Sequence, residues 1–106
     1  MTSDIEALGR RAVACKGWRW MPGMLTDVGE RVADPTICYL GTLPDFSDPA
    51  TLGGLLALVR EAWGDPLAHV APVAGGWRVW LEKELSVFFD GATEASALVA
   101  ALEVTP

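Results

Sequence analysis

The sequence predicts an α+β fold in which an antiparallel sheet of about four strands packs against two or three helices. Three segments have the apolar spacing of a helix, and segments between them alternate like short strands. The 106 residues contain neither an internal repeat nor a long linker, so we expect a single compact domain over residues 1–106. Hydrophobic residues make up 51% and charged residues 21%, which is ordinary for a globular protein with a sizeable core.

A first helix is predicted near the start of the chain. Ser3 and Glu6 have the spacing of a capping box, in which each side chain accepts a hydrogen bond from a free backbone N–H of the first turn. Apolar side chains then recur at helical spacing, and the helix is expected to run to about Lys16 because Gly17 follows.

Two short strands are expected before the middle of the chain. Trp18 and Trp20 flank Arg19, which predicts a strand over residues 18–21 with both tryptophans on one face. Residues 36–40 are rich in branched and aromatic side chains and predict another strand.

The clearest element is a helix that begins after Asp48. This carboxylate can accept hydrogen bonds from the first backbone N–H groups, and Pro49 suits the first helical position. A single apolar stripe follows, made of Leu52, Leu55, Leu56, Val59 and Trp63. Gly64 and Pro66 end the helix, which we expect to pack on the apolar face of the sheet.

After a loop over residues 65–76, the sequence predicts a hairpin. Residues 77–82 and 85–89 alternate like strands, joined tightly around Lys83 and Glu84. One face is wholly apolar: Trp77, Val79, Leu81, Leu85, Val87 and Phe89. The other face is mixed and includes Arg78, Trp80, Glu82, Ser86 and Phe88.

A final helix is expected after the hairpin. Thr93 can cap it, and Leu98, Val99 and Leu102 form its apolar side.

Acidic residues dominate the charge. The formal net charge is −6; residues 27–65 hold seven acids and two arginines, a balance of −5, and residues 82–103 hold five acids and one lysine, a balance of −4. Such negative charge opposes nonspecific binding to nucleic-acid phosphates and favours binding to a partner protein with a basic surface. The candidate contacts are Asp45, Asp48, Glu82, Glu84, Asp90 and Glu94, and the alternative is that these residues form an ordinary solvated face.

Five tryptophans are many for this length. Trp63 and Trp77 fall on apolar stripes, which favours core packing. Trp80 shares a strand face with Arg78 and can pair with Phe88, so it is either covered by a helix or exposed as an anchor for a partner.

An alternative function is nucleic-acid binding. The basic residues that would contact phosphates are Arg10, Arg11, Lys16 and Arg19. Trp18 or Trp20 would stack on the nucleobases. This alternative predicts an affinity for nucleic acid that falls steeply as the salt concentration rises, whereas a function in protein binding predicts no affinity for DNA.

The sequence offers little for catalysis. His69, Cys15 and Cys38 are too few for a structural zinc site, and no glycine motif for nucleotide phosphates is present. We therefore expect no metal, no cofactor and no catalytic residue. A small enzyme, with His69 beside a thiol or paired carboxylates, is a second alternative.

The sequence also predicts where the protein acts. The first residues do not resemble a secretory signal, and the longest apolar run is too short to span a membrane. The two cysteines indicate no disulfide framework. We expect a cytoplasmic protein without membrane contact.

Three stretches resemble small proteins encoded by bacteriophages and prophages. They are residues 10–24 (RRAVACKGWRWMPGM), residues 45–66 (DFSDPATLGGLLALVREAWGDP), and the tail around GGWRVW and GATEASALVAAL. In this tail a tryptophan-containing hairpin precedes a helix that begins with Thr-Glu-Ala, which is similar to the phage ABA sandwich domain. The resemblance covers most of the chain and supplies no catalytic residues.

The resemblance implies an accessory protein of a mobile element that acts inside a bacterial host. Such proteins include inhibitors of host defence, such as anti-CRISPR proteins, which bind and occlude their targets. We therefore expect noncatalytic binding to a host protein, such as a nucleic-acid-binding defence component, through Trp80, Phe88 and the acidic candidates named above.

Overall fold

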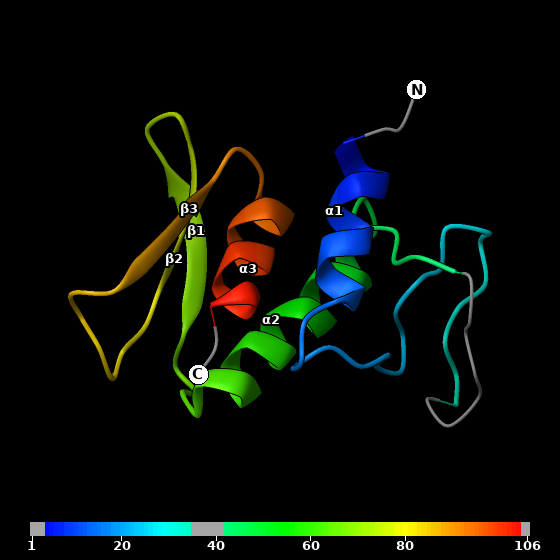
Figure 1. Cartoon of the computed structure of the whole chain (residues 1–106), viewed down its shortest axis with the longest axis horizontal. Helices are drawn as coiled ribbons and strands as arrows, with labels where there is room; N and C mark the ends of the chain where they lie inside the picture. Colours follow the sequence, from blue (N-terminus) through cyan, green and yellow to red (C-terminus); the bar gives the residue numbers. More distant parts are fainter. Residues whose placement is uncertain (1–3, 35–41, 105–106) are drawn as a thin grey trace.

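The computed structural model describes residues 4–34 and 42–104. Its elements are, in chain order, α1 (Asp4–Val13), α2 (Pro49–Trp63), β1 (His69–Val73), β2 (Gly76–Trp80), β3 (Phe88–Gly91) and α3 (Glu94–Glu103) (Figure 1). The predicted α+β class is confirmed. The sheet in the described residues has three antiparallel strands in the order β1-β2-β3, where about four were predicted.

The strand predicted over residues 18–21 is wrong, and the one predicted over residues 36–40 lies outside the described residues. Trp18 and Trp20 are nevertheless neighbours, with ring centroids 5.5 Å apart, and both pack against the core. Arg19 between them pairs with Glu61 of α2. The alternation therefore reflects a segment that lies beside a helix with its tryptophans inward, which a strand pattern alone does not distinguish from pairing in a sheet.

The sequence predicts a loop where the structure has β1. This strand has five residues and includes Pro72, which cannot donate a hydrogen bond to a neighbouring strand. Proline is tolerated here because β1 lies at an edge of the sheet.

The β2–β3 hairpin is shorter than predicted. Trp80 is opposite Phe88, so residues 81–87 form a loop rather than a tight turn. Leu85, predicted to face inward, is 77% exposed. The ladder stops because the backbone N–H of Lys83 donates to the carboxylate of Asp65 at 3.0 Å instead of to a strand.

The helix that covers the sheet is α3, so the expectation that the central helix does so is wrong. α3 contacts all three strands and also α1 and α2, so it lies between the sheet and the other helices (Figure 1). Most of its side chains are buried, namely Ala95, Ala97, Leu98, Val99, Ala101 and Leu102. A helix that is apolar nearly all round suits a position between two layers. α2 packs mainly against α3, and it also reaches the sheet through Trp63, whose ring centroid is 5.7 Å from that of Phe89.

Both predicted ends of α2 are confirmed. Asp48 accepts a hydrogen bond from the Thr51 N–H at 3.0 Å, and Pro49 is the first helical residue. Gly64 ends the helix with a φ of 61°, a left-handed conformation that favours glycine. The N-terminal helix stops earlier than predicted, at Val13, and Ser3 of its predicted capping box lies outside the described residues.

The junction between β3 and α3 leaves no room for a side chain at Gly91. A Cβ atom there would lie 2.7 Å from the backbone carbonyl carbon of Ser96 and would overlap the Ala97 nitrogen. We expect Gly91→Ala to lower the free energy of unfolding by about 1–3 kcal/mol, because the strand or the helix must move. Urea denaturation followed by circular dichroism measures this change.

The matched control is Gly53→Ala in α2, where a Cβ would meet open space. This change should raise the free energy of unfolding by about 0.5–1 kcal/mol, since alanine favours the helix. Effects of the same sign at both glycines would contradict the close strand–helix approach.

Candidate partner-binding surface

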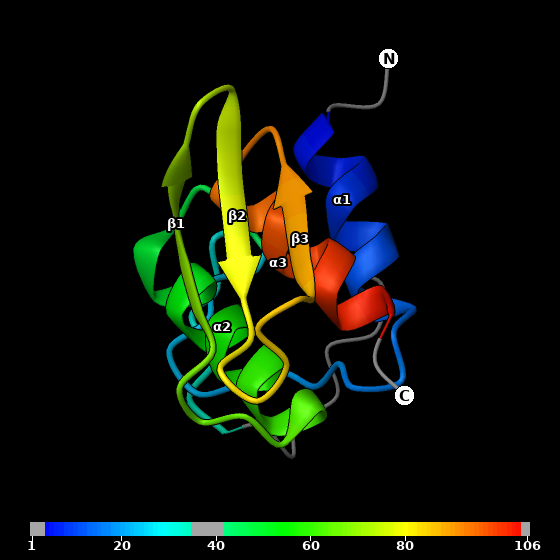
Figure 2. The same ribbon diagram turned by 90° about the vertical axis from the view of Figure 1, so that its left-hand side faces the viewer.

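The face of the sheet opposite α3 is open among the described residues: Figure 2 shows the strands in front and the helices behind. Val79 is buried and Phe89 packs against the core, so these two side chains point toward α3. Successive side chains of a strand point to opposite faces. Trp80 and Phe88 therefore lie on the open face.

A row of aromatic rings crosses the open face at one end of the sheet. His69 of β1 is opposite Trp80 of β2, and Trp80 is opposite Phe88 of β3. The predicted cross-strand pairing of Trp80 with Phe88 is thus confirmed. The His69 ring stacks on the Trp80 ring, with centroids 5.2 Å apart and planes inclined by 22°.

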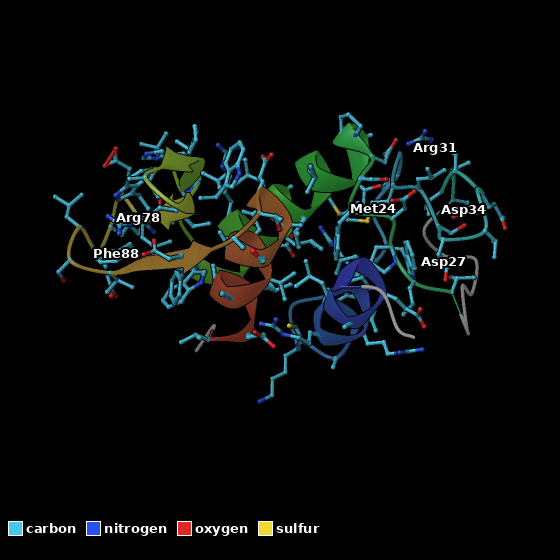
Figure 3. The ribbon with its side chains drawn as sticks, turned by 90° about the horizontal axis from the view of Figure 1, so that it is seen from above. Met24, Asp27, Arg31, Asp34, Arg78 and Phe88 are labelled. Carbon is cyan, nitrogen blue, oxygen red and sulfur yellow. The ribbon has the colours of Figure 1, made fainter. Side chains whose placement is uncertain are left out.

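Arg78 lies against this row, beside Phe88 in Figure 3. Its guanidinium carbon is 4.1 Å from the ring centroid of Phe88 and 6.0 Å from that of Trp80. Its Nε and Nη2 atoms donate to the two carboxylate oxygens of Asp90 at 2.6 and 3.0 Å. This bidentate bond holds the pKa of Asp90 below its usual range and raises the pKa of Arg78. The pair is neutral as a unit, and it fixes the guanidinium against the rings.

Exposed leucines lie in the two loops at the same end of the sheet as the aromatic row. Leu67, in the loop before β1, is 66% exposed, and Leu85, in the β2–β3 loop, is 77% exposed. Phe88 itself is 48% exposed. We call Leu67, His69, Trp80, Leu85 and Phe88 the sheet-end patch. Exposed apolar side chains gathered in one place, with polar residues around them, are typical of protein-binding sites.

Two carboxylates border the sheet-end patch. Glu82 and Glu84 are exposed in the β2–β3 loop, and neither belongs to an ion pair within the part of the chain that the structure describes. Lys83 between them folds back toward the end of α2, with its Nζ 3.9 Å from where a Cβ of Gly64 would lie. The loop therefore presents negative charge beside an apolar surface.

Most of the predicted contact residues lie together. Trp80, Phe88 and Asp90 share the open face, and Glu82 and Glu84 lie in the adjoining loop. These five residues come from two strands and one loop that are consecutive in the sequence.

The other three predicted contacts lie elsewhere. Glu94 begins α3, beyond the opposite end of β3 from Phe88. Asp48 caps α2 and accepts a hydrogen bond from Arg31, which holds the pKa of Asp48 below its usual range. Asp45 accepts a hydrogen bond from the Ser47 N–H at 3.0 Å. Asp45 and Asp48 thus stabilise local structure, and the acidic residues do not form one continuous surface.

The sequence does not predict the two leucines of the patch as surface contacts. Leu67 falls in a predicted loop, and the alternation predicts Leu85 on the inner face of a strand. A usable signal precedes Leu85, since three charged residues in a row, Glu82 to Glu84, are unfavourable in a strand.

The residues of the nucleic-acid alternative are largely engaged within the protein. Arg10 pairs with Glu6, Arg11 with Glu103 and Arg19 with Glu61, and Lys16 forms no ion pair within the described residues. Paired arginines release fewer counterions from a phosphate backbone than free ones. The two tryptophans of this alternative, Trp18 and Trp20, pack against each other and the core.

The residues of the enzyme alternative are not brought together in the described part of the chain. His69 stacks on Trp80, and its Nδ1 lies 3.4 Å from the Leu67 carbonyl oxygen. Cys15 follows α1, and α1 lies on the other side of α3 from the sheet (Figure 1). Burial raises the pKa of the Cys15 thiol, which opposes formation of a thiolate. Cys38 lies outside the described residues.

Within residues 4–34 and 42–104, no three His, Cys, Asp or Glu side chains are grouped so that they could hold a metal ion. No helix in the same residues has both the length and the apolar character needed to cross a bilayer. Comparisons with protein-family models, curated proteins and solved structures give no match. The resemblance to phage proteins and to the ABA sandwich domain therefore stays a prediction.

Proposed function

We propose that this protein acts by noncatalytic binding to another protein, with the sheet-end patch as the contact surface. The observation that carries this proposal is the aromatic row on the open sheet face, in which His69 and Phe88 are exposed and Trp80 is half-buried, with the exposed Leu67 and Leu85 in the loops at the same end of the sheet. Ring contacts and the Arg78–Asp90 bond hold the aromatic side chains in place before any partner binds. A preordered surface loses less conformational entropy when it binds.

The ring geometry favours a protein partner over a nucleic acid. Binding of single-stranded nucleic acid uses free aromatic faces on which bases stack. His69 already stacks on Trp80, and the guanidinium of Arg78 lies over Phe88. What remains exposed is an aromatic and aliphatic surface with neutralised charge, which suits the apolar centre of a protein interface.

The border of the patch favours a partner with basic residues around an apolar centre. Glu82 and Glu84 are exposed and free of ion pairs within the described residues. Complementary charges at the rim of an interface mainly speed the encounter and select the partner. The narrower proposal, an inhibitor of a defence protein in a bacterial cytoplasm, is supported by the phage-like stretches and the acidic charge of the chain.

A photo-crosslinking experiment tests the proposal. A benzophenone side chain introduced at Leu85 is expected to form a covalent adduct with a protein in a bacterial lysate. The same group at Val28, which is 71% exposed, is the matched control. Val28 follows Asp27, which Figure 3 places at the opposite end of the molecule from Arg78 and Phe88.

The expected result is an adduct from position 85 that is absent from position 28 and is lost when Trp80 is replaced by threonine. Equal adducts from both positions, or an adduct that survives the loss of Trp80, would exclude the sheet-end patch as the contact. Adducts with nucleic acid in place of protein would support the alternative function.

A further inference from the structure

Asp65 is a buried carboxylate that belongs to neither the patch nor the core. It follows the C-cap of α2 and is 2% exposed. Its Oδ1 accepts a hydrogen bond from the Leu67 N–H at 3.2 Å, and its Oδ2 accepts one from the Lys83 N–H at 3.0 Å. The backbone N–H of Glu82 also donates to this carboxylate.

These hydrogen bonds join two loops that are distant in sequence. Leu67 lies in the loop between α2 and β1, and Glu82 and Lys83 lie in the loop between β2 and β3. The same two loops supply Leu67 and Leu85 of the sheet-end patch and the two glutamates at its border. A carboxylate that accepts several backbone N–H bonds holds its donors in a defined geometry.

We infer that Asp65 is a positioning residue that holds the loop part of the partner-binding surface in place. The inference rests on the proposed function for its meaning, but its structural part can be tested on the protein alone. The aromatic row is held by strand pairing and ring contacts. The two loops that carry the leucines and glutamates are instead joined to each other by the Asp65 carboxylate.

The charged neighbours of Asp65 favour its ionised form. The N–H group of Lys83 contributes most to holding the pKa of Asp65 below its usual range, and the Lys83 ammonium adds to the effect. Arg60 also approaches this loop, where its Nε donates to the Ala68 carbonyl oxygen at 2.7 Å. Because the folded-state pKa is lowered, the ionised carboxylate keeps its hydrogen bonds when the pH reaches the ordinary aspartate pKa of about 4, and loses them only as the pH falls through the lower folded-state value.

Amide hydrogen exchange of Asp65→Asn tests the inference. The asparagine side chain keeps the size of aspartate but loses the charge and one acceptor oxygen. The amides of Leu67, Glu82 and Lys83 are expected to exchange on the order of tenfold faster, because hydrogen bonds to a charged group are lost. Amides of β2 should keep their protection. The matched control is Asp45→Asn, whose carboxylate also accepts a backbone N–H, and it should leave the same three amides unchanged.

A second measurement covers the case in which Asp65→Asn does not fold. In the unaltered protein, the amide proton shifts of Leu67, Glu82 and Lys83 should titrate with one shared midpoint below pH 4. Unchanged exchange in a folded Asp65→Asn, or shifts that titrate with unrelated midpoints, would overturn the inference whatever the fate of the proposed function. If the crosslink from position 85 is found, Asp65→Asn should reduce its yield more than that of a crosslinker at position 88.

Discussion

Replacement of Leu98 by alanine is expected to lower the free energy of unfolding by about 3–5 kcal/mol. Leu98 is completely buried in α3, the helix that contacts the sheet on one side and α1 and α2 on the other. A cavity at this position is bordered by well-packed elements from both sides, so it cannot collapse easily. Proteins of this size have a total stability of about 5–15 kcal/mol, so the loss is a large part of the whole.

Urea denaturation monitored by circular dichroism measures this loss, and the melting temperature should fall by roughly 10–20 °C. The control is Leu85→Ala. Because Leu85 is 77% exposed, this substitution should change the free energy of unfolding by at most about 0.5 kcal/mol. Similar losses at both leucines would contradict the placement of α3 as the central packing element.

The second large effect concerns partner binding. Trp80→Thr is expected to weaken binding to the protein crosslinked at position 85 by about 30-fold or more, which corresponds to the loss of an interface hot spot. The double variant with Phe88→Thr should lose more, although the two effects need not add. Threonine is chosen because it retains the preference for a strand. Both side chains lie on the open face, so the sheet should persist and stability should change by only about 1 kcal/mol.

Isothermal titration calorimetry with the purified partner measures the dissociation constants of these variants. Val28→Thr, on the exposed turn at the other end of the molecule, is the control and should bind like the unaltered protein. Binding that survives the double variant, or falls equally with Val28→Thr, would place the contact away from the aromatic row.

Several local predictions are confirmed because their signals act within a few residues. Asp48, Pro49 and Gly64 mark the ends of α2, and each acts through a hydrogen bond or a dihedral angle of its own turn. Thr93 likewise caps α3 through a capping box with Ser96. The pairing of Trp80 with Phe88 was also predictable, because it follows from the order and alternation of two adjacent strands.

The errors have a common cause in contacts between distant segments. The end of the β2–β3 ladder is decided by Asp65, which is far from that hairpin in sequence and takes the N–H of Lys83. α3 is the main cover of the sheet because its apolar side chains pack against the strands on one side and against α1 and α2 on the other. Neither effect leaves a periodic signal in its own segment.

The residues of the candidate site likewise divide into those that the sequence predicts and those that only the folded structure brings together. One stretch of the sequence predicts Trp80, Phe88 and the glutamates beside them, since strand alternation and charge are properties of that stretch. The separation of Asp45 and Asp48 from them, and the addition of Leu67 and His69, required the folded chain. Helix capping and strand alternation depend on residues that are close in the sequence, so the sequence alone predicts them. A binding surface is assembled from distant segments that meet only when the core is packed.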